Sequence, residues 1–226
     1  MPHPSNYFGH EAEYVRRRAA GNPGWDTARV IAENLALLDE VFVAEHMPKG
    51  GRLVELGCGA GDLSLWAAER GYQVDGIDIS PFAIAWAKEK ASDRGLKAHF
   101  QVGSVLDLTP YGADSFEIVL DGHCFHCIIG DDRPRFLEES FRVLKPGGVL
   151  HLNTMCGDPS PGQLARFDAA TRNIIHGGAA VRHLGLPEDI EGEVAAAGFT
   201  ILARRCIPRL TDAEDDDTLL IDATKR

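Results

Sequence analysis

One stretch of the sequence decides the fold: Val54-Glu55-Leu56-Gly57-Cys58-Gly59-Ala60-Gly61. Apolar residues predict a strand over 52–56, and the pattern over 62–70 predicts a helix that ends at Gly71. Glycines between a strand and a helix let the backbone turn sharply and let a ligand approach with no Cβ in the way. The stretch therefore predicts a ligand site on a strand–turn–helix unit.

A carboxylate follows at the end of the next predicted strand, 72–77. Asp78 lies about twenty residues after the first glycine, where doubly wound sheets place an acid that accepts hydrogen bonds from ribose. The dinucleotide fingerprint places a glycine three residues after the second one, but this chain has Asp62 there, a negative charge unsuited to pyrophosphate. Because the acid Glu55 also precedes the turn, the lining suits a ligand with ammonium and sulfonium groups.

Short apolar runs alternate with helical patterns between 50 and 155, which is typical of βαβ units and a parallel sheet. Asp26 is expected to cap a long N-terminal helix. After the fifth strand, a helix and two strands flank the acidic run 212–217, which predicts an antiparallel pair at one sheet edge. Strands are expected at 52–56, 72–77, 97–102, 116–120, 149–154, 199–207 and 218–223, and helices at 11–20, 26–48, 62–70, 80–94, 133–144 and 187–197.

No internal repeat or domain boundary is visible, so we expect a single domain over 1–226. It is expected to consist of an N-terminal helical cap (1–48), a cofactor-binding core (50–154), a substrate-side insertion (155–186) and a C-terminal helix and strand pair (187–226). Within the insertion, one amphipathic stretch with helical spacing is expected, with Leu164, Phe167, Thr171 and Ile174 on one face.

The motifs as a set resemble those of class I S-adenosylmethionine-dependent methyltransferases. They are 54–61, 76–80 (Gly76-Ile77-Asp78-Ile79-Ser80), 116–121 and 142–148 (Arg142-Val143-Leu144-Lys145-Pro146-Gly147-Gly148), in family order. The resemblance implies an α/β fold with a Rossmann-like, seven-stranded, mostly parallel sheet, an antiparallel last strand, helices on both faces and an N-terminal helical cap. It also implies S-adenosyl-L-methionine as the cofactor.

The resemblance assigns roles to individual residues. Gly57, Cys58 and Gly59 are expected to contact the methionine moiety by backbone, and Asp78 the ribose. After the third strand the family often has an acid that binds the adenine amino group; here Ser104 is expected to accept that hydrogen bond, and the Val105 amide to donate to the ring. The full set of expected cofactor-binding residues is Glu55, Gly57, Cys58, Gly59, Gly61, Asp78, Ile79, Ser104, Val105 and Asp121.

The loop after the fourth strand, Asp121-Gly122-His123-Cys124-Phe125-His126-Cys127, carries the candidate catalytic groups. His123 and His126 lie where a base would meet the cofactor, and histidine titrates near neutrality. The alternatives are that they line the substrate pocket or hydrogen-bond within the loop. Asp121 and Gly122 are expected to offer backbone carbonyls to the cofactor ammonium. The His–Cys spacing also fits zinc, but no matching second pair occurs, so no metal is expected.

Substrate selection is expected in two segments that cover the crevice. The N-terminal segment, which in similar enzymes folds over the cofactor, contributes Tyr7, Tyr14 and Trp25. The insertion contributes Arg172 and His176. For each of these residues, packing or surface charge is the competing interpretation.

The formal net charge is −11, and the only basic cluster is Arg16-Arg17-Arg18. Nucleic-acid binding needs a basic stripe, so a small-molecule substrate is expected and a nucleic-acid partner is not. Five cysteines in apolar or loop contexts fit a reducing compartment. No signal peptide or membrane span is recognisable, which favours a cytoplasmic enzyme, either monomer or homodimer.

The sequence thus predicts a methyltransferase that acts on an oxygen, nitrogen or sulfur nucleophile of a small molecule. One alternative keeps the cofactor but uses its sulfonium for cyclisation or aminocarboxypropyl transfer, which releases methylthioadenosine. A non-catalytic binding module and a nicotinamide-dependent dehydrogenase are further alternatives. The intact polar loop weighs against the first, and the glycine spacing weighs against the second.

Overall fold

The computed structural model describes residues 4–209 and 216–226, and its centre is a seven-stranded sheet. The strand order is β3-β2-β1-β4-β5-β10-β9. The bounds are β1 (Arg52–Leu56), β2 (Gln73–Asp78), β3 (Ala98–Val102), β4 (Phe116–Gly122), β5 (Leu144–Cys156), β9 (Thr200–Ile207) and β10 (Asp217–Thr224).

The sheet is parallel from β3 to β5, and β10 runs antiparallel to both of its neighbours, β5 and β9. The expected antiparallel pair at one sheet edge is therefore confirmed, with β9 outermost. The strand order reverses between β1 and β4, the point where open α/β sheets bind ligands at the carboxyl ends of their strands. The fold class predicted from the sequence is confirmed.

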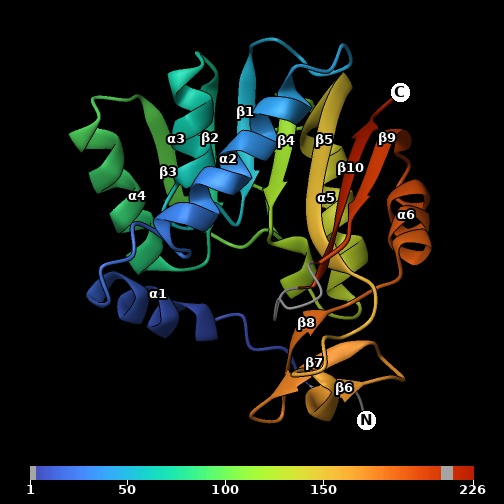
Figure 1. Ribbon diagram of the computed structural model, residues 1–226. Coiled ribbons are helices and arrows are strands. Elements are labelled where there is room, and N and C mark those ends of the chain that lie inside the picture. The colour runs from blue at the N-terminus through green and yellow to red at the C-terminus, as the bar shows by residue number, and fades with distance from the viewer. Residues whose placement is uncertain (1–3, 210–215) are drawn as a thin grey trace.

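Helices cover both faces of the sheet (Figure 1). On one face, α2 (Ala28–Phe42), α3 (Asp62–Glu69) and α4 (Pro81–Asp93) bury apolar side chains such as Leu38, Trp66 and Ile84. On the other, α5 (Asp132–Val143) and α6 (Pro187–Ala196) bury Phe136 and Val194 against β5 and β10. Apolar side chains thus fix the sheet on both of its faces, and polar groups gather at its strand ends.

Two helix starts, those of α4 and α2, can be compared with the caps expected from the sequence. The Ser80 hydroxyl accepts a hydrogen bond from the Ala83 amide, and Pro81 occupies the first turn of α4, as expected. The prediction that Asp26 caps α2 is wrong, because the cap is Thr27, whose hydroxyl accepts from the Val30 amide at 3.4 Å. β5 also begins earlier than predicted, at Leu144.

A second layer lies across the carboxyl ends of the parallel strands, at the bottom of Figure 1. It contains α1 (Gly9–Ala19) and a three-stranded antiparallel sheet of β6 (Phe167–Asp168), β7 (Asn173–His176) and β8 (Ala179–His183), called here the small sheet. Two short 3-10 helices, η1 (Phe125–Cys127) and η2 (Leu164–Arg166), adjoin it. The helical spacing expected in the insertion is wrong, because Phe167 and Ile174 pair across neighbouring strands.

The N-terminal segment 4–8 ties these parts together. The Ala180 amide of β8 donates to the Pro4 carbonyl at 3.0 Å, and Ser5 forms a parallel bridge with Ala180. The Tyr7 hydroxyl donates to an Asp132 carboxylate oxygen at 2.8 Å and accepts from the Ile129 amide. One segment therefore connects the small sheet to the start of α5.

Two further expectations concern the chain as a whole. In the acidic run 212–217, residues 212–215 lie outside the described residues, and Asp217 begins β10. Among the described helices, none combines the length and the apolar character that a membrane crossing requires.

Candidate active site

The glycine turn, residues 57–61, joins β1 to α3 at the point where the strand order reverses. Gly57, Gly59 and Gly61 have φ angles of +69°, +51° and +78°, in the left-handed region that favours glycine. The Gly57 and Cys58 amides both donate to the Ile77 carbonyl, at 2.8 and 3.0 Å. Two backbone hydrogen bonds therefore fix the start of the turn to the end of β2.

Asp78 holds the same turn from the end of β2. One carboxylate oxygen accepts from the Gly59 amide at 2.9 Å, and the other accepts from the Ser80 amide at 2.8 Å. The side chain is 6% exposed, and burial raises the pKa of its carboxyl. Each carboxylate oxygen can accept a second bond, so Asp78 retains acceptor capacity for a hydroxyl pair.

Glu55 is the second buried acid of the turn. Its carboxylate accepts from the Ser64 hydroxyl at 2.5 Å and is 2% exposed. Burial raises the pKa of Glu55 to about 8. Asp62 forms an ion pair with Lys90 of α4, and its charge adds to the effect of burial on the pKa of Glu55.

The turn is covered by two side chains from distant parts of the chain. A Cβ built on Gly59 would lie 2.3 Å from the Tyr14 hydroxyl of α1, and one on Gly57 would lie 2.6 Å from the Cys124 sulfur. Trp25 packs on the Tyr14 ring at 4.9 Å between centroids. Glu11 of α1 accepts from the Ser80 hydroxyl and the Phe82 amide, which docks α1 on the start of α4.

The post-β4 loop, residues 123–131, is organised by Asp121. One oxygen of its fully buried carboxylate accepts from the Cys124 and Phe125 amides at 2.9 and 3.0 Å. Burial raises the pKa of Asp121 to about 7. His123 adopts a φ of +81°, and its amide donates to the Asn153 carbonyl of β5 at 3.1 Å. The loop thus folds back over the ends of β4 and β5.

His123 and His126 lie together in this loop, with ring centroids 5.6 Å apart. His126 is 4% exposed, and burial, followed by the charges of His123 and Arg182, holds its pKa well below the usual range. At neutral pH the His126 ring is therefore uncharged. Burial also raises the pKa of Cys127 to about 12, so that thiol stays protonated.

Buried polar atoms without a partner mark this side of the site. The structure gives none, among its described residues, to His126 Nδ1, Asn153 Oδ1 or Thr154 Oγ1. Buried polar atoms in native proteins are almost always hydrogen-bonded, so unpartnered ones at strand ends point to a bound molecule. With the glycine cradle and the buried acids Glu55, Asp78 and Asp121, the residues fit a cationic nucleoside cofactor.

Arg133 was missed by the sequence reasoning. This guanidinium is 3% exposed, forms two bonds with the Glu193 carboxylate of α6 at 2.8 and 2.6 Å, and donates to the Phe125 and Ile128 carbonyls. Arg133 therefore links the post-β4 loop to α6. Its spacing in the sequence indicates burial, because Arg133 shares a helical face with the buried residues Leu137 and Ser140.

The expected adenine contacts lie along the neighbouring edge. Ile79 is half-buried beside Asp78, and Val105 is buried. The Ser104 hydroxyl accepts from the Leu106 amide at 3.2 Å, so it already supports its own loop. Their contacts with adenine stay predictions.

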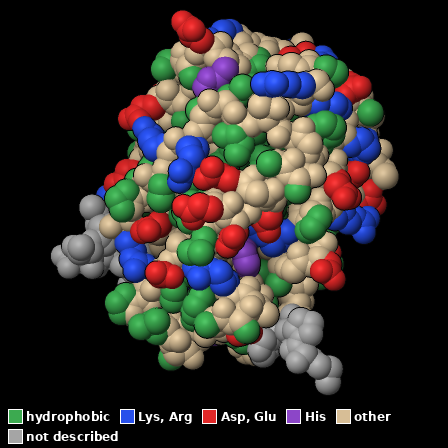
Figure 2. Space-filling view, turned by 90° about the vertical axis from the view of Figure 1, so that its right-hand side faces the viewer, with side chains coloured by type: hydrophobic (Ala, Val, Ile, Leu, Met, Phe, Trp, Pro, Cys, Tyr) green, Lys and Arg blue, Asp and Glu red, His purple; other side chains and the backbone are tan. Residues whose placement is uncertain are grey.

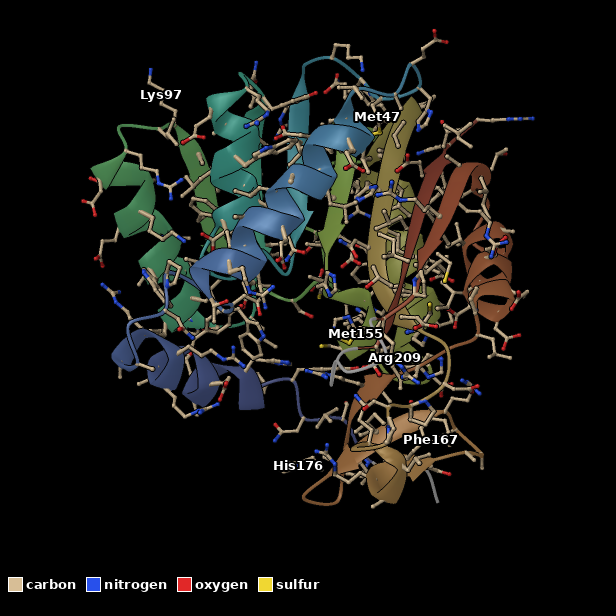
Figure 3. All side chains as sticks on the ribbon, viewed as in Figure 1. Met47, Lys97, Met155, Phe167, His176 and Arg209 are labelled. Carbon is tan, nitrogen blue, oxygen red and sulfur yellow. The ribbon has the colours of Figure 1, made fainter. Side chains whose placement is uncertain are left out.

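The two residues expected in the insertion lie apart from the others. The Arg172 guanidinium donates to the Leu184 and Gly157 carbonyls, both at 2.6 Å, and so fastens the small sheet to the end of β5. His176 is exposed at the far end of the small sheet (Figure 3), whereas Met155 lies where the two sheets meet. Within residues 4–209 and 216–226, no three histidine, cysteine or acidic side chains form a group that could hold a metal ion.

The fold and this site define an α/β enzyme that binds a nucleoside cofactor. Residues 54–152 match the family model "Methyltransferase domain". A ubiquinone biosynthesis O-methyltransferase from Xanthomonas oryzae is 30% identical over 166 residues, which cover 72% of this chain and 68% of that protein. The chain belongs to the class I S-adenosylmethionine-dependent methyltransferases, and its cofactor is S-adenosylmethionine.

Two further similarities agree with this membership. A ribosomal RNA small subunit methyltransferase C from Alcanivorax borkumensis is 31% identical over 150 residues, 65% of this chain but only 45% of that protein. A solved S-adenosylmethionine-dependent methyltransferase from Methanosarcina mazei superposes with a TM-score of 0.69 at 25% identity, covering 81% of this chain and 96% of its own. The chain thus matches less than half of the length of the ribosomal RNA methyltransferase.

Proposed function

We propose that this enzyme methylates an oxygen, nitrogen or sulfur nucleophile of a small molecule, held between the post-β4 loop and the small sheet. The observation that carries the proposal is the buried, unpartnered ring nitrogen Nδ1 of His126 in the post-β4 loop, at the carboxyl end of β4. The O-methyltransferase similarity is compatible with a small acceptor. η1, which carries His126, packs against both β5 and β8, so the proposed acceptor site lies among elements that are close together.

Surface charge supports a small acceptor. In the face shown in Figure 2, described basic side chains are interspersed with acidic ones and form no continuous basic patch. Binding of a nucleic-acid backbone depends on such a patch, and the formal net charge of −11 opposes it. The match to the ribosomal RNA enzyme, which covers 45% of that protein, is explained by the shared cofactor core.

The cofactor, when bound, supplies a methyl group already activated by its sulfonium, so the protein contributes alignment, exclusion of water and a proton acceptor. Asp78 and the glycine turn orient the nucleoside, and the carboxylates of Glu55 and Asp121 attract the positive charge. Tyr14 and Cys124 exclude water above the turn. The neutral His126 offers Nδ1 to the acceptor's proton and can take that proton up as the acceptor is methylated.

A product assay tests this proposal. The protein would be incubated with S-adenosylmethionine and a library of small phenols, amines and thiols, and the nucleoside product identified by mass spectrometry. We expect S-adenosylhomocysteine and a methylated acceptor, and slower turnover with unchanged cofactor affinity in His126→Gln. Methylthioadenosine as the product would instead support the cyclase or aminocarboxypropyl-transferase alternative.

A further inference from the structure

Arg182 of β8 differs from the other cations of the described structure. Most Lys and Arg side chains there bond to a carboxylate or a backbone carbonyl, as Arg133 and Arg172 do. Within residues 4–209 and 216–226, six form neither kind of contact, and five of these are exposed. These six are Lys88, Lys97, Arg135, Arg166, Arg182 and Arg226. Arg182 alone among them is half-buried.

The strand geometry turns Arg182 toward the active site. Arg182 lies opposite Ile174 of β7, which is 2% exposed, so the two side chains share a face of the small sheet, and Leu184, the next residue on that face, is 0% exposed. The strand β8 packs directly against η1, which carries His126 and Cys127. The charge of Arg182 reaches both residues and, after the larger effect of burial, contributes to the low pKa of His126.

A half-buried guanidinium without an anion is costly. It has lost part of its hydration, and proteins seldom bury cations unless they are paired. Its planar fork of N–H donors matches a carboxylate, which it binds through two parallel hydrogen bonds. In this position the partner would lie beside His126 Nδ1, the unpartnered ring nitrogen.

We infer that the methyl acceptor carries a carboxylate, and that Arg182 binds this carboxylate while His126 faces the nucleophile. The inference rests on the proposed function, because it assigns a substrate class to the same site. Arg182 is then the residue that determines specificity. Arg172, the expected substrate residue, is occupied by the carbonyls of Leu184 and Gly157.

Binding of matched acids and amides tests the inference. Calorimetric titrations would use the full chain saturated with S-adenosylhomocysteine and two probe pairs, benzoate with benzamide and 4-hydroxybenzoate with 4-hydroxybenzamide. We expect each acid to bind about 10- to 100-fold more tightly than its amide, the range for a charge-assisted pair. Arg182→Gln should abolish this preference, Arg182→Lys should keep part of it, and Arg166→Gln, an exposed site in the same insertion, should leave it unchanged.

Two results would overturn the inference: acids that bind no more tightly than their amides to the wild-type protein, or a preference that survives in Arg182→Gln. The wild-type comparison needs no variant, so it decides the matter even if Arg182→Gln does not fold. The two proposals can fail separately. Absent binding of S-adenosylhomocysteine would contradict the proposed function, whereas normal binding of it without any acid preference contradicts only the role of Arg182.

Discussion

The β1–β2 side of the site and the β4–β5 side differ in what holds them in shape. On the first, backbone amides of the glycine turn bond to the Ile77 carbonyl and to Asp78, within a segment of about 25 residues. On the second, the post-β4 loop depends on side chains from α5, α6 and the N-terminal segment, above all Arg133 and Tyr7. The comparison teaches that the glycine turn is a local structure, whereas the proposed substrate site is assembled from distant segments.

The largest effect is expected on the local side, from Gly59→Ala. The new Cβ would lie 2.3 Å from the Tyr14 hydroxyl in a backbone with φ +51°, so overpacking and strain add. We expect cofactor affinity to fall roughly 1000-fold, about 4 kcal/mol, by calorimetry. Gly71→Ala is the matched control, because Gly71 has φ +86° but no atom near its Cβ position.

A double variant sharpens this prediction. Tyr14→Phe removes the hydroxyl and leaves the ring carbon 3.2 Å from the same Cβ position. Gly59→Ala should therefore cost clearly less affinity in the Tyr14→Phe background than in the wild type. Equal losses in both backgrounds would show that strain, not the contact with α1, explains the effect.

The next effect is expected on the assembled side, from Arg133→Met. Removing this guanidinium leaves the Glu193 carboxylate and two loop carbonyls without their partner, and breaking a buried pair costs about 3 kcal/mol in the free energy of unfolding. Urea denaturation measures this loss. Turnover should fall while cofactor affinity changes less than about twofold, because the glycine turn is held separately.

Arg29→Met is the control for Arg133→Met. Arg29 also pairs with a glutamate, Glu33, but its side chain is 76% exposed. Its loss should cost less than about 0.5 kcal/mol. A comparable loss in both variants would contradict the structural role given to Arg133.

A change in pH is expected to have a smaller effect, and this effect is on cofactor affinity. Glu55 and Asp121 have pKa values raised by burial to about 8 and about 7, so both lose their negative charge as pH falls. Affinity for the cationic cofactor should decline about tenfold between pH 8.5 and pH 6.5, because only the charged carboxylates attract it. Glu55→Gln should flatten this pH dependence in calorimetric titrations. An unchanged slope of affinity against pH would contradict the role given to the Glu55 charge.

The same pKa shift affects stability with the opposite sign. In the cofactor-free protein, folded Glu55 keeps a proton that the unfolded chain releases near pH 4.5. Its contribution to stability is therefore fully present below pH 4.5 and is lost as pH rises through about 8. Thermal melts of Glu55→Gln should lack this part of the pH dependence.

The smallest effect is expected from His176→Ala. His176 is exposed at the end of β7, away from the glycine turn and the post-β4 loop. We expect less than about 0.5 kcal/mol in unfolding free energy and less than about a twofold change in kcat/KM. A large loss of kcat/KM at constant stability would instead restore the role expected for it from the sequence.

The contrast between the two sides also explains what the sequence could predict. Gly57, Gly59, Gly61 and Asp78 are close in the chain, and their spacing carries the geometry of the turn, so the fold class and the cofactor were predictable. Arg133 works through Glu193, sixty residues away, and no local pattern links the two. The hydrophobic spacing from Leu164 to Ile174 fits a helix, but antiparallel pairing with β8 overrides it.

The bridge between Ser5 and Ala180 has a consequence for engineering. Because the Ala180 amide of β8 donates to the Pro4 carbonyl, an insertion transplanted from a relative would meet an N-terminal segment that did not evolve with it. Chimeras that exchange residues 155–186 alone should misplace the small sheet, whereas those that also exchange residues 4–8 should keep it in place. The N-terminal segment and the insertion are, in effect, one transferable module encoded in two places.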